Sequence, residues 1–145
     1  MQKLILSFWV GLAAQMAAAA PETPAAGTPL RQDLLNTIRV MAGFDLGPPI
    51  EFVVLDLRVD GDRAFAQVMA QRPGGAPIDL ATSPMAQRDQ VPTDLIDGPR
   101  MEAFLVHENG AWYVDAYAIG ATDVWWIGPP FCAAYAQLLP DWACD

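Results

Sequence analysis

The chain has 145 residues, and its 17 acidic residues outnumber eight basic ones to give a formal net charge of −9. This charge repels nucleic-acid phosphates and anionic lipid surfaces, so nucleic acid is excluded as an expected partner. No metal-binding, nucleotide-binding or catalytic motif stands out, so we expect neither a metal ion nor another cofactor.

Residues 1–20 have the pattern of a secretory signal peptide. Lys3 precedes an apolar run over 4–12, and small residues rich in alanine follow. The run is shorter than the roughly 20 apolar residues that a membrane-spanning helix needs, so no membrane span is expected. We therefore predict a periplasmic or secreted protein that is cleaved after Ala19 or Ala20.

The rest of the chain divides into a leader and one domain. Residues 21–28 are rich in proline and alanine and predict a flexible leader. Residues 29–145 are enough for a single domain with a modest core. Its first element is an amphipathic helix, predicted over 29–42, with Thr28 as N-cap and Gly43 as the residue that ends it.

Two β-rich runs around Asp60-Gly61 predict a first antiparallel hairpin. Side chains on each strand alternate between an apolar face, predicted to be core, and a mixed face. The apolar face contains Val53, Leu55, Leu57, Val59, Ala64, Ala66 and Val68. The mixed face contains Phe52, Val54, Asp56, Arg58, Arg63, Phe65, Gln67 and Met69.

A long loop over 72–100 follows the first hairpin. Its prolines and glycines exclude a long regular element, although Ser83-Pro84 could begin a short helical turn. The stretch RPGGAP lacks the spacing and the lysine of a phosphate-binding loop, so phosphate binding is not expected. We predict a structural crossover or a rim over one face of the sheet.

Asn109-Gly110 predicts the turn of a second hairpin. Its apolar face contains Met101, Ala103, Leu105, His107, Trp112, Val114, Ala116 and Ala118. Its mixed face contains Glu102, Phe104, Val106, Tyr113, Asp115 and Tyr117. One helix and two such hairpins predict an α+β fold in which a four-stranded antiparallel sheet packs on the N-terminal helix.

The order of helix, hairpin, long crossover and hairpin resembles the cystatin-like and NTF2-like α+β rolls. The strings IEFVVLDLRVDGDRAFAQV, RPGGAPID and IGATDV are similar to a family of small exported bacterial proteins that has no assigned activity. The resemblance implies a roll and export, and it brings no catalytic residues with it.

The C-terminal part contains both cysteines, Cys132 and Cys144. Because an exported chain meets oxidising conditions, we predict a disulfide between them. A short helix is expected between them, begun at Pro130 and stopped by Pro140.

A tryptophan pair precedes this segment, in the stretch IGATDVWW. Thr122-Asp123 predicts a turn, and an extended chain after it would point Trp125 and Trp126 to opposite sides. We expect Trp125 to be buried and Trp126 to remain available to a partner.

The sequence favours binding over catalysis. His107 is the only histidine and Ser83 the only serine after the predicted signal, so a Ser-His-Asp triad is not expected. The leading hypothesis is a non-catalytic exported module that binds an unidentified protein or small molecule through the mixed face. Its candidate residues are Phe65, Phe104, Tyr113, Asp115, Tyr117 and Trp126.

Two alternatives stay open. One is a small NTF2-like acid-base enzyme in which Asp56 or Asp115, buried among aromatic rings, acts as the base. The other is a structural domain whose sheet face forms a homodimer. A closed pocket around the aspartate would favour the enzyme, and an open flat face would favour an interface.

Overall fold

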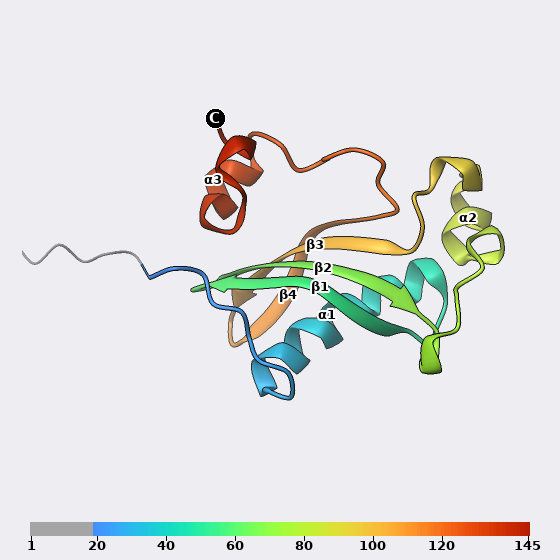
Figure 1. Ribbon diagram of the computed structural model, residues 1–145, viewed down its shortest axis with the longest axis horizontal. Coiled ribbons are helices and arrows are strands. Elements are labelled where there is room, and N and C mark those ends of the chain that lie inside the picture. The colour runs from blue at the N-terminus through green and yellow to red at the C-terminus, as the bar shows by residue number, and fades with distance from the viewer. Residues whose placement is uncertain (1–18) are drawn as a thin grey trace, which may run out of the picture.

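Four antiparallel strands form one sheet in the order β1-β2-β3-β4, with helix α1 across one of its faces (Figure 1). The computed structural model describes residues 19–145, so nearly all of the predicted signal peptide lies outside the described residues. The elements are α1 (Pro29–Leu46), β1 (Glu51–Asp60), β2 (Arg63–Gln71), α2 (Pro84–Asp89), β3 (Arg100–Glu108), β4 (Ala111–Ile119) and α3 (Phe131–Tyr135). The predicted α+β class, four-stranded sheet and short C-terminal helix are confirmed.

No helix within 19–145 is long and apolar enough to cross a membrane.

Helix α1 begins as predicted but ends four residues later. The Thr28 side chain accepts a hydrogen bond from the backbone N–H of Arg31, and Pro29 is the first helical residue. The helix passes through Gly43 and ends at Leu46, and the C-cap residue is Gly47, whose φ of 76° suits glycine. The predicted end was wrong because Leu46 extends the buried stripe of Leu34, Ile38 and Ala42 by one more turn, and its burial offsets the cost of a mid-helix glycine.

The predicted flexible leader, 21–28, is instead tied to the sheet. Glu22 forms an isolated antiparallel bridge with Val59, with N–H to O distances of 2.8 and 2.9 Å. Pro24 is buried, and its carbonyl oxygen accepts a hydrogen bond from the Arg31 guanidinium at 3.0 Å. These backbone contacts fix the leader against the outer edge of β1.

The first hairpin turns at Gly61-Asp62, one residue later than predicted, because Asp60 faces Arg63. Each β1 residue near the turn therefore pairs with a β2 residue two positions later than predicted. A shift of two positions leaves each side chain on its predicted face. Leu55 forms a β-bulge between Val54 and Asp56. Because of this extra residue, the side chains from Phe52 to Leu55 lie on the face opposite to the predicted one. Phe52 and Val54 pack toward α1, whereas Val53 and Leu55 are exposed. The assignment of these four residues was wrong.

The second hairpin turns at Asn109-Gly110 as predicted, since Glu108 faces Ala111. A bulge at Asp115 again inverts the faces beyond it. Tyr117 and Ile119 pack toward α1, so Tyr117 does not belong to the mixed face and Ala116 and Ala118 do not belong to the apolar one.

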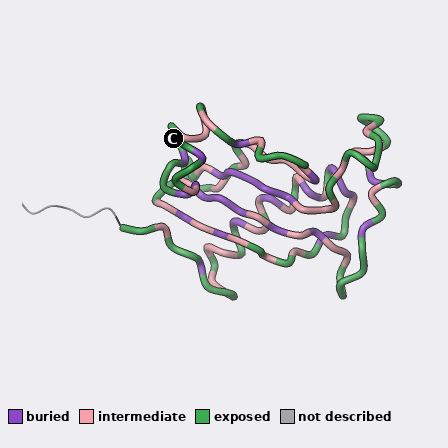
Figure 2. The backbone as a smooth tube through the Cα atoms, turned by 45° about the horizontal axis from the view of Figure 1, so that its top comes forward, coloured by how far each residue is buried: buried purple, intermediate pink, exposed green. Residues whose placement is uncertain are grey.

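The main core lies between the sheet and α1, where buried positions follow the strands (Figure 2). The crossover between β2 and β3 lies at one end of the sheet and consists of short turns and α2, which Ser83 caps as the sequence predicts. The Arg72 side chain donates hydrogen bonds to the carbonyl oxygens of Leu46, Gly47 and Pro49, which joins the crossover to the end of α1.

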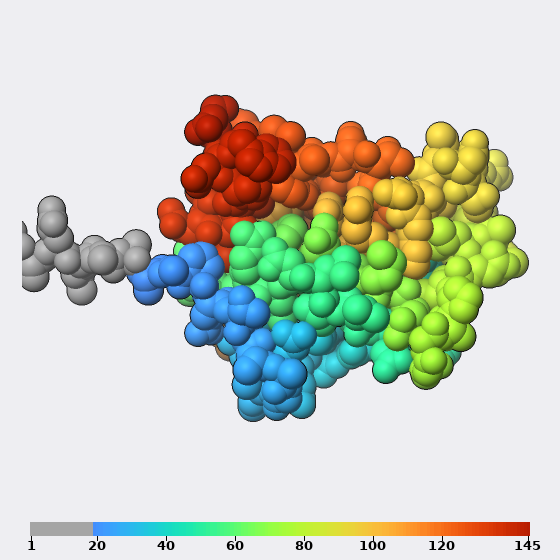
Figure 3. Space-filling model, in the orientation of Figure 1, coloured from blue at the N-terminus to red at the C-terminus, as the bar shows by residue number. Residues whose placement is uncertain are grey.

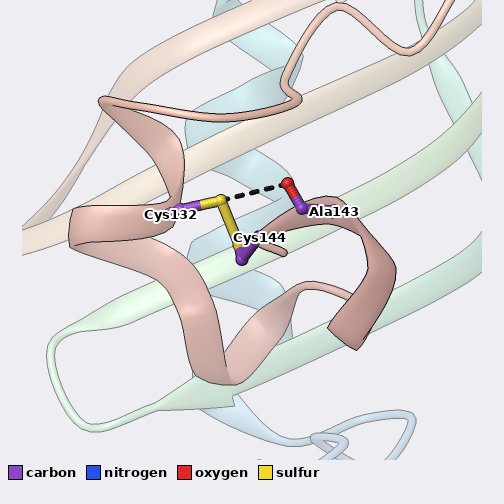
Figure 4. The surroundings of a disulfide bond; sticks show 3 residues. All are labelled: Cys132, Ala143 and Cys144. Atoms are coloured by element: carbon purple, nitrogen blue, oxygen red, sulfur yellow. Dashed lines mark hydrogen bonds between the residues drawn. A yellow bond between two sulfur atoms is a disulfide. The ribbon is translucent and has the colours of Figure 1, made fainter.

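The C-terminal segment, residues 121–145, covers the other face of the sheet, opposite α1 (Figure 3). It forms a second core with β2 and β3 that contains Phe65, Phe104, Trp126, Tyr135, Leu138, Leu139 and Ala143. The Sγ atoms of Cys132 and Cys144 are 2.11 Å apart, which confirms the predicted disulfide (Figure 4). The Cys132 sulfur also lies 3.2 Å from the Ala143 carbonyl oxygen. Both faces of the sheet are therefore covered.

Candidate functional site

The C-terminal segment covers much of the predicted mixed face, although Tyr113 and Asp115 stay exposed. Phe65 and Phe104 are buried beneath the C-terminal segment, and Trp126 of that segment is buried against them. The Phe104 ring lies 4.6 Å from the Tyr135 ring and 4.9 Å from the Phe131 ring, measured between centroids. These three candidate binding residues are therefore occupied by contacts within the chain.

The tryptophan pair does not lie in an extended strand. Trp125 and Trp126 form a turn, and both indole Nε1–H groups donate to the same Glu102 oxygen, at 2.9 and 3.1 Å. Trp126 is only 8% exposed, whereas Trp125 is partly buried. The expected opposite orientations and the expected exposure of Trp126 were wrong, because a shared acceptor turns both rings toward the sheet.

Glu102 is a residue that sequence reasoning missed. It is 8% exposed, and its other carboxylate oxygen accepts a hydrogen bond from the Gln67 amide at 2.9 Å. A glutamate on an alternating strand has the pattern of a solvent-facing residue. The signal that could have found it is the neighbouring pair of indoles, since buried indole N–H groups need an acceptor. Glu102 anchors the C-terminal segment to the sheet.

Neither aspartate suggested as a base is free. Asp56 forms an ion pair with Arg58 at 2.9 Å. Asp115 accepts a hydrogen bond from the Tyr135 hydroxyl at 2.7 Å. Burial and then this hydrogen bond raise the pKa of Tyr135, so the hydroxyl stays protonated as a donor. Asp115 is exposed and Asp56 is ion-paired at the surface, so neither has the desolvated setting that the acid-base hypothesis requires.

The helix side of the sheet carries an open groove between α1 and β4. Two adjoining hollows of about 380 Å³ each share Thr37 and Trp112. A third, separate hollow of about 330 Å³ lies further along both elements, where residues of α2 also line it. We call these three hollows together the α1–β4 groove. Its lining on α1 is Asp33, Asn36, Thr37, Val40, Met41, Phe44 and Asp45. Its lining on the second hairpin is His107 and residues 110–114 and 117–119.

One wall of the groove is the outer edge of β4, the last strand of the sheet. Glu108 and Ala111 flank a two-residue turn, so their backbone groups bond to each other. Backbone groups in an antiparallel pair alternate in direction, so the N–H and C=O groups of Trp112 and Val114 point away from β3, toward the open edge. No backbone hydrogen bond reaches these two residues from elsewhere in 19–145. The groove therefore presents unpaired donors and acceptors beside apolar side chains.

The middle of the groove is apolar and exposed. Val40 on α1 is 65% exposed, and the partly buried side chains of Met41 on α1 and Val114 on β4 line the same hollow. Tyr113 and Asp115 are the two candidate binding residues from the sequence that stay exposed, and both side chains lie on the face of β4 that points away from α1. Large apolar side chains exposed together around a hollow are typical of an interaction site.

A hydrogen-bonded cluster closes one end of the groove. Asp45 is 7% exposed and accepts hydrogen bonds from the Tyr117 hydroxyl at 2.8 Å and from Arg88 at 2.7 Å. The Arg88 guanidinium also bonds Asp89 and lies over the Phe44 ring, 4.4 Å from its centroid. Because a cation and a hydroxyl both hold the Asp45 carboxylate, the cluster joins α1, α2 and β4 rather than supplying a base.

We expect Tyr117→Phe to lower the free energy of unfolding by about 1.5 kcal/mol at pH 8, since it removes a donor from a buried carboxylate. Burial and then the Asp45 hydrogen bond raise the pKa of Tyr117 to about 12, above its unfolded value. This stabilisation is therefore present below about pH 10 and is lost as the pH rises toward 12. Urea unfolding at pH 8 and 11.5 measures the difference between the two proteins.

Tyr113→Phe is the matched control, because Tyr113 is half exposed on the same strand. It is expected to change stability by less than about 0.5 kcal/mol at either pH. Equal effects of the two substitutions at pH 8 would contradict the role of the Tyr117 hydroxyl.

Comparison of the chain with known proteins identified no relative. No protein-family model matches the chain, and neither the curated proteins nor the solved structures contain a significant match. The function is therefore inferred from the geometry alone.

Proposed function

We propose that the protein is an exported, non-catalytic binding module that holds an extended peptide segment of a partner protein in the α1–β4 groove. The observation that carries the proposal is the unpaired outer edge of β4 beside an apolar hollow. A peptide that adds as a strand to such an edge satisfies the backbone groups of Trp112 and Val114, and alternate side chains of the peptide enter the hollow.

The dimensions of the groove suit a short segment. From Asp33 to Asp45 the helix advances about 18 Å, at 1.5 Å per residue. An extended peptide rises about 3.3 Å per residue, so about six residues span this length. The apolar side chains of Val40, Met41 and Val114 line the middle hollow, where they would lose contact with water on binding.

Export is supported by the signal-like pattern of residues 1–20 and by the disulfide, which suits an oxidising compartment. We also propose that the fold is a cystatin-like or NTF2-like roll within a family of small exported proteins. A helix packed on a four-stranded antiparallel sheet with a long crossover supports this proposal. The proposed site differs from the mixed face predicted from the sequence, because the C-terminal segment covers that face.

Selection from a displayed library of random 12-residue peptides tests the function. We expect the purified protein to enrich peptides with apolar residues at alternate positions. Val40→Glu places a charge in the middle hollow and should weaken their binding at least about tenfold, which corresponds to 1.4 kcal/mol. Leu95→Glu is the matched control, because Leu95 is equally exposed, at 62%, but lies on the crossover. It should leave the affinity unchanged.

Backbone N-methylation separates strand addition from other kinds of binding. Methyl groups on alternate peptide nitrogens that face β4 should abolish binding, whereas methyl groups on the intervening nitrogens should be tolerated. Failure to enrich any peptide, or equal tolerance of both methylation patterns, would overturn the proposal. Self-association of the protein that Val40→Glu abolishes would instead identify a second copy as the occupant.

A further inference from the structure

We infer that the peptide segment bound in the α1–β4 groove is basic, with lysine or arginine beside its apolar residues. This inference rests on the function proposed above. The observation behind it is the distribution of charge around the groove, which combines carboxylates at both ends with an uncharged middle.

The first end of the groove has one carboxylate, that of Asp33, and no arginine in its lining. Asp33 lines the hollow beside His107 and Trp112, and Glu22 lines the neighbouring hollow that shares His107 and Trp112. No ion pair within residues 19–145 includes Asp33 or Glu22. The Trp112 ring forms part of the same wall, so a cationic side chain there gains both a carboxylate and an aromatic face.

The second end also favours a cation. Asp45 and Asp89 both contact Arg88, so this cluster carries two negative charges and one positive charge. Arg88 is the one arginine that lines any of the three hollows, as far as the described residues go. The cluster keeps a net negative charge, and Asp89, whose side chain is 48% exposed, is the carboxylate that a lysine or arginine of a peptide could reach.

The two arginines of α1, Arg31 and Arg39, bind groups outside the lining of the groove. Arg31 donates to the Pro24 carbonyl oxygen, and Arg39 donates to the Ile50 carbonyl oxygen and lies over the Phe52 ring. Both guanidinium groups reach the β1 side of the sheet, and Arg39 also donates to the Asn36 side chain, but neither arginine lines the groove. A second copy of this chain, with its net charge of −9, has the wrong sign for this surface, so the inference commits to a basic partner.

The peptides enriched by selection provide the test. They should contain more lysine and arginine than the unselected library, at positions beside the apolar residues. Resynthesis with these residues changed to glutamine should weaken binding about tenfold, and a change to glutamate should weaken it further. Raising sodium chloride from 50 to 500 mM should weaken the basic peptide and leave the glutamine version nearly unchanged.

Asp33→Asn should reduce the difference between the basic and glutamine peptides by several-fold. Asp94→Asn is the matched control, since Asp94 is exposed on the crossover, and it should leave the difference intact. If basic and glutamine peptides bind equally well and N-methylation still abolishes binding, the inference is wrong and the peptide-binding function stands. If no peptide binds with the expected methylation pattern, the proposed function itself fails.

Discussion

Leu57→Ala is expected to lower the free energy of unfolding by about 2 to 5 kcal/mol, whereas Leu55→Ala should lower it by less than about 1 kcal/mol. The two leucines lie two residues apart on β1, and simple alternation assigns both to the core. Leu57 is 1% exposed between the sheet and α1, so its truncation leaves a cavity. Leu55 is 50% exposed, so its truncation leaves none.

Urea unfolding of both variants at neutral pH, followed by far-ultraviolet circular dichroism, measures the two losses. Each leucine serves as the control for the other, because the substitution, the strand and the side-chain volume are the same. Losses of similar size would contradict a bulge at Leu55 and would restore the uninterrupted alternation that the sequence predicts.

The bulges explain which parts of the sheet could be predicted. Near both turns the alternating pattern identified the buried face correctly, including Leu57, Ala66 and Leu105. Beyond Leu55 the sequence is apolar on both faces, since Phe52, Val53, Val54 and Leu55 are consecutive. With no polar residue to mark the solvent side, the pattern carries no information about the extra residue that inverts the faces.

The site was harder to predict than the fold, because it depends on contacts between distant segments. Phe65 and Phe104 were correctly placed on the face away from α1, but the sequence does not show that residues 121–145 return to cover that face. Local patterns likewise do not show that the edge of β4 lies beside Val40. That neighbourhood follows from how the helix crosses the sheet, which tertiary packing determines.

Glu102→Ala is expected to cost about 3 kcal/mol, because it leaves two indole N–H groups and the Gln67 amide without their shared acceptor. The loss should concentrate in the C-terminal segment, since Trp125 and Trp126 belong to it and α1 packs on the opposite face. Acrylamide quenching of tryptophan fluorescence should therefore increase, while far-ultraviolet circular dichroism changes little under native conditions.

Two further variants make the test specific. Glu108→Ala removes an exposed carboxylate from the same strand and should cost less than about 0.5 kcal/mol. Glu102→Gln keeps one acceptor oxygen for the indoles and removes the charge, so its cost should fall between those of the two alanine variants. If Glu102→Ala and Glu108→Ala are equally stable and equally quenched, the carboxylate does not anchor the segment. If Glu102→Gln instead matches the wild-type protein, hydrogen bonding to a neutral oxygen is sufficient and the negative charge contributes nothing to holding the C-terminal segment against the sheet.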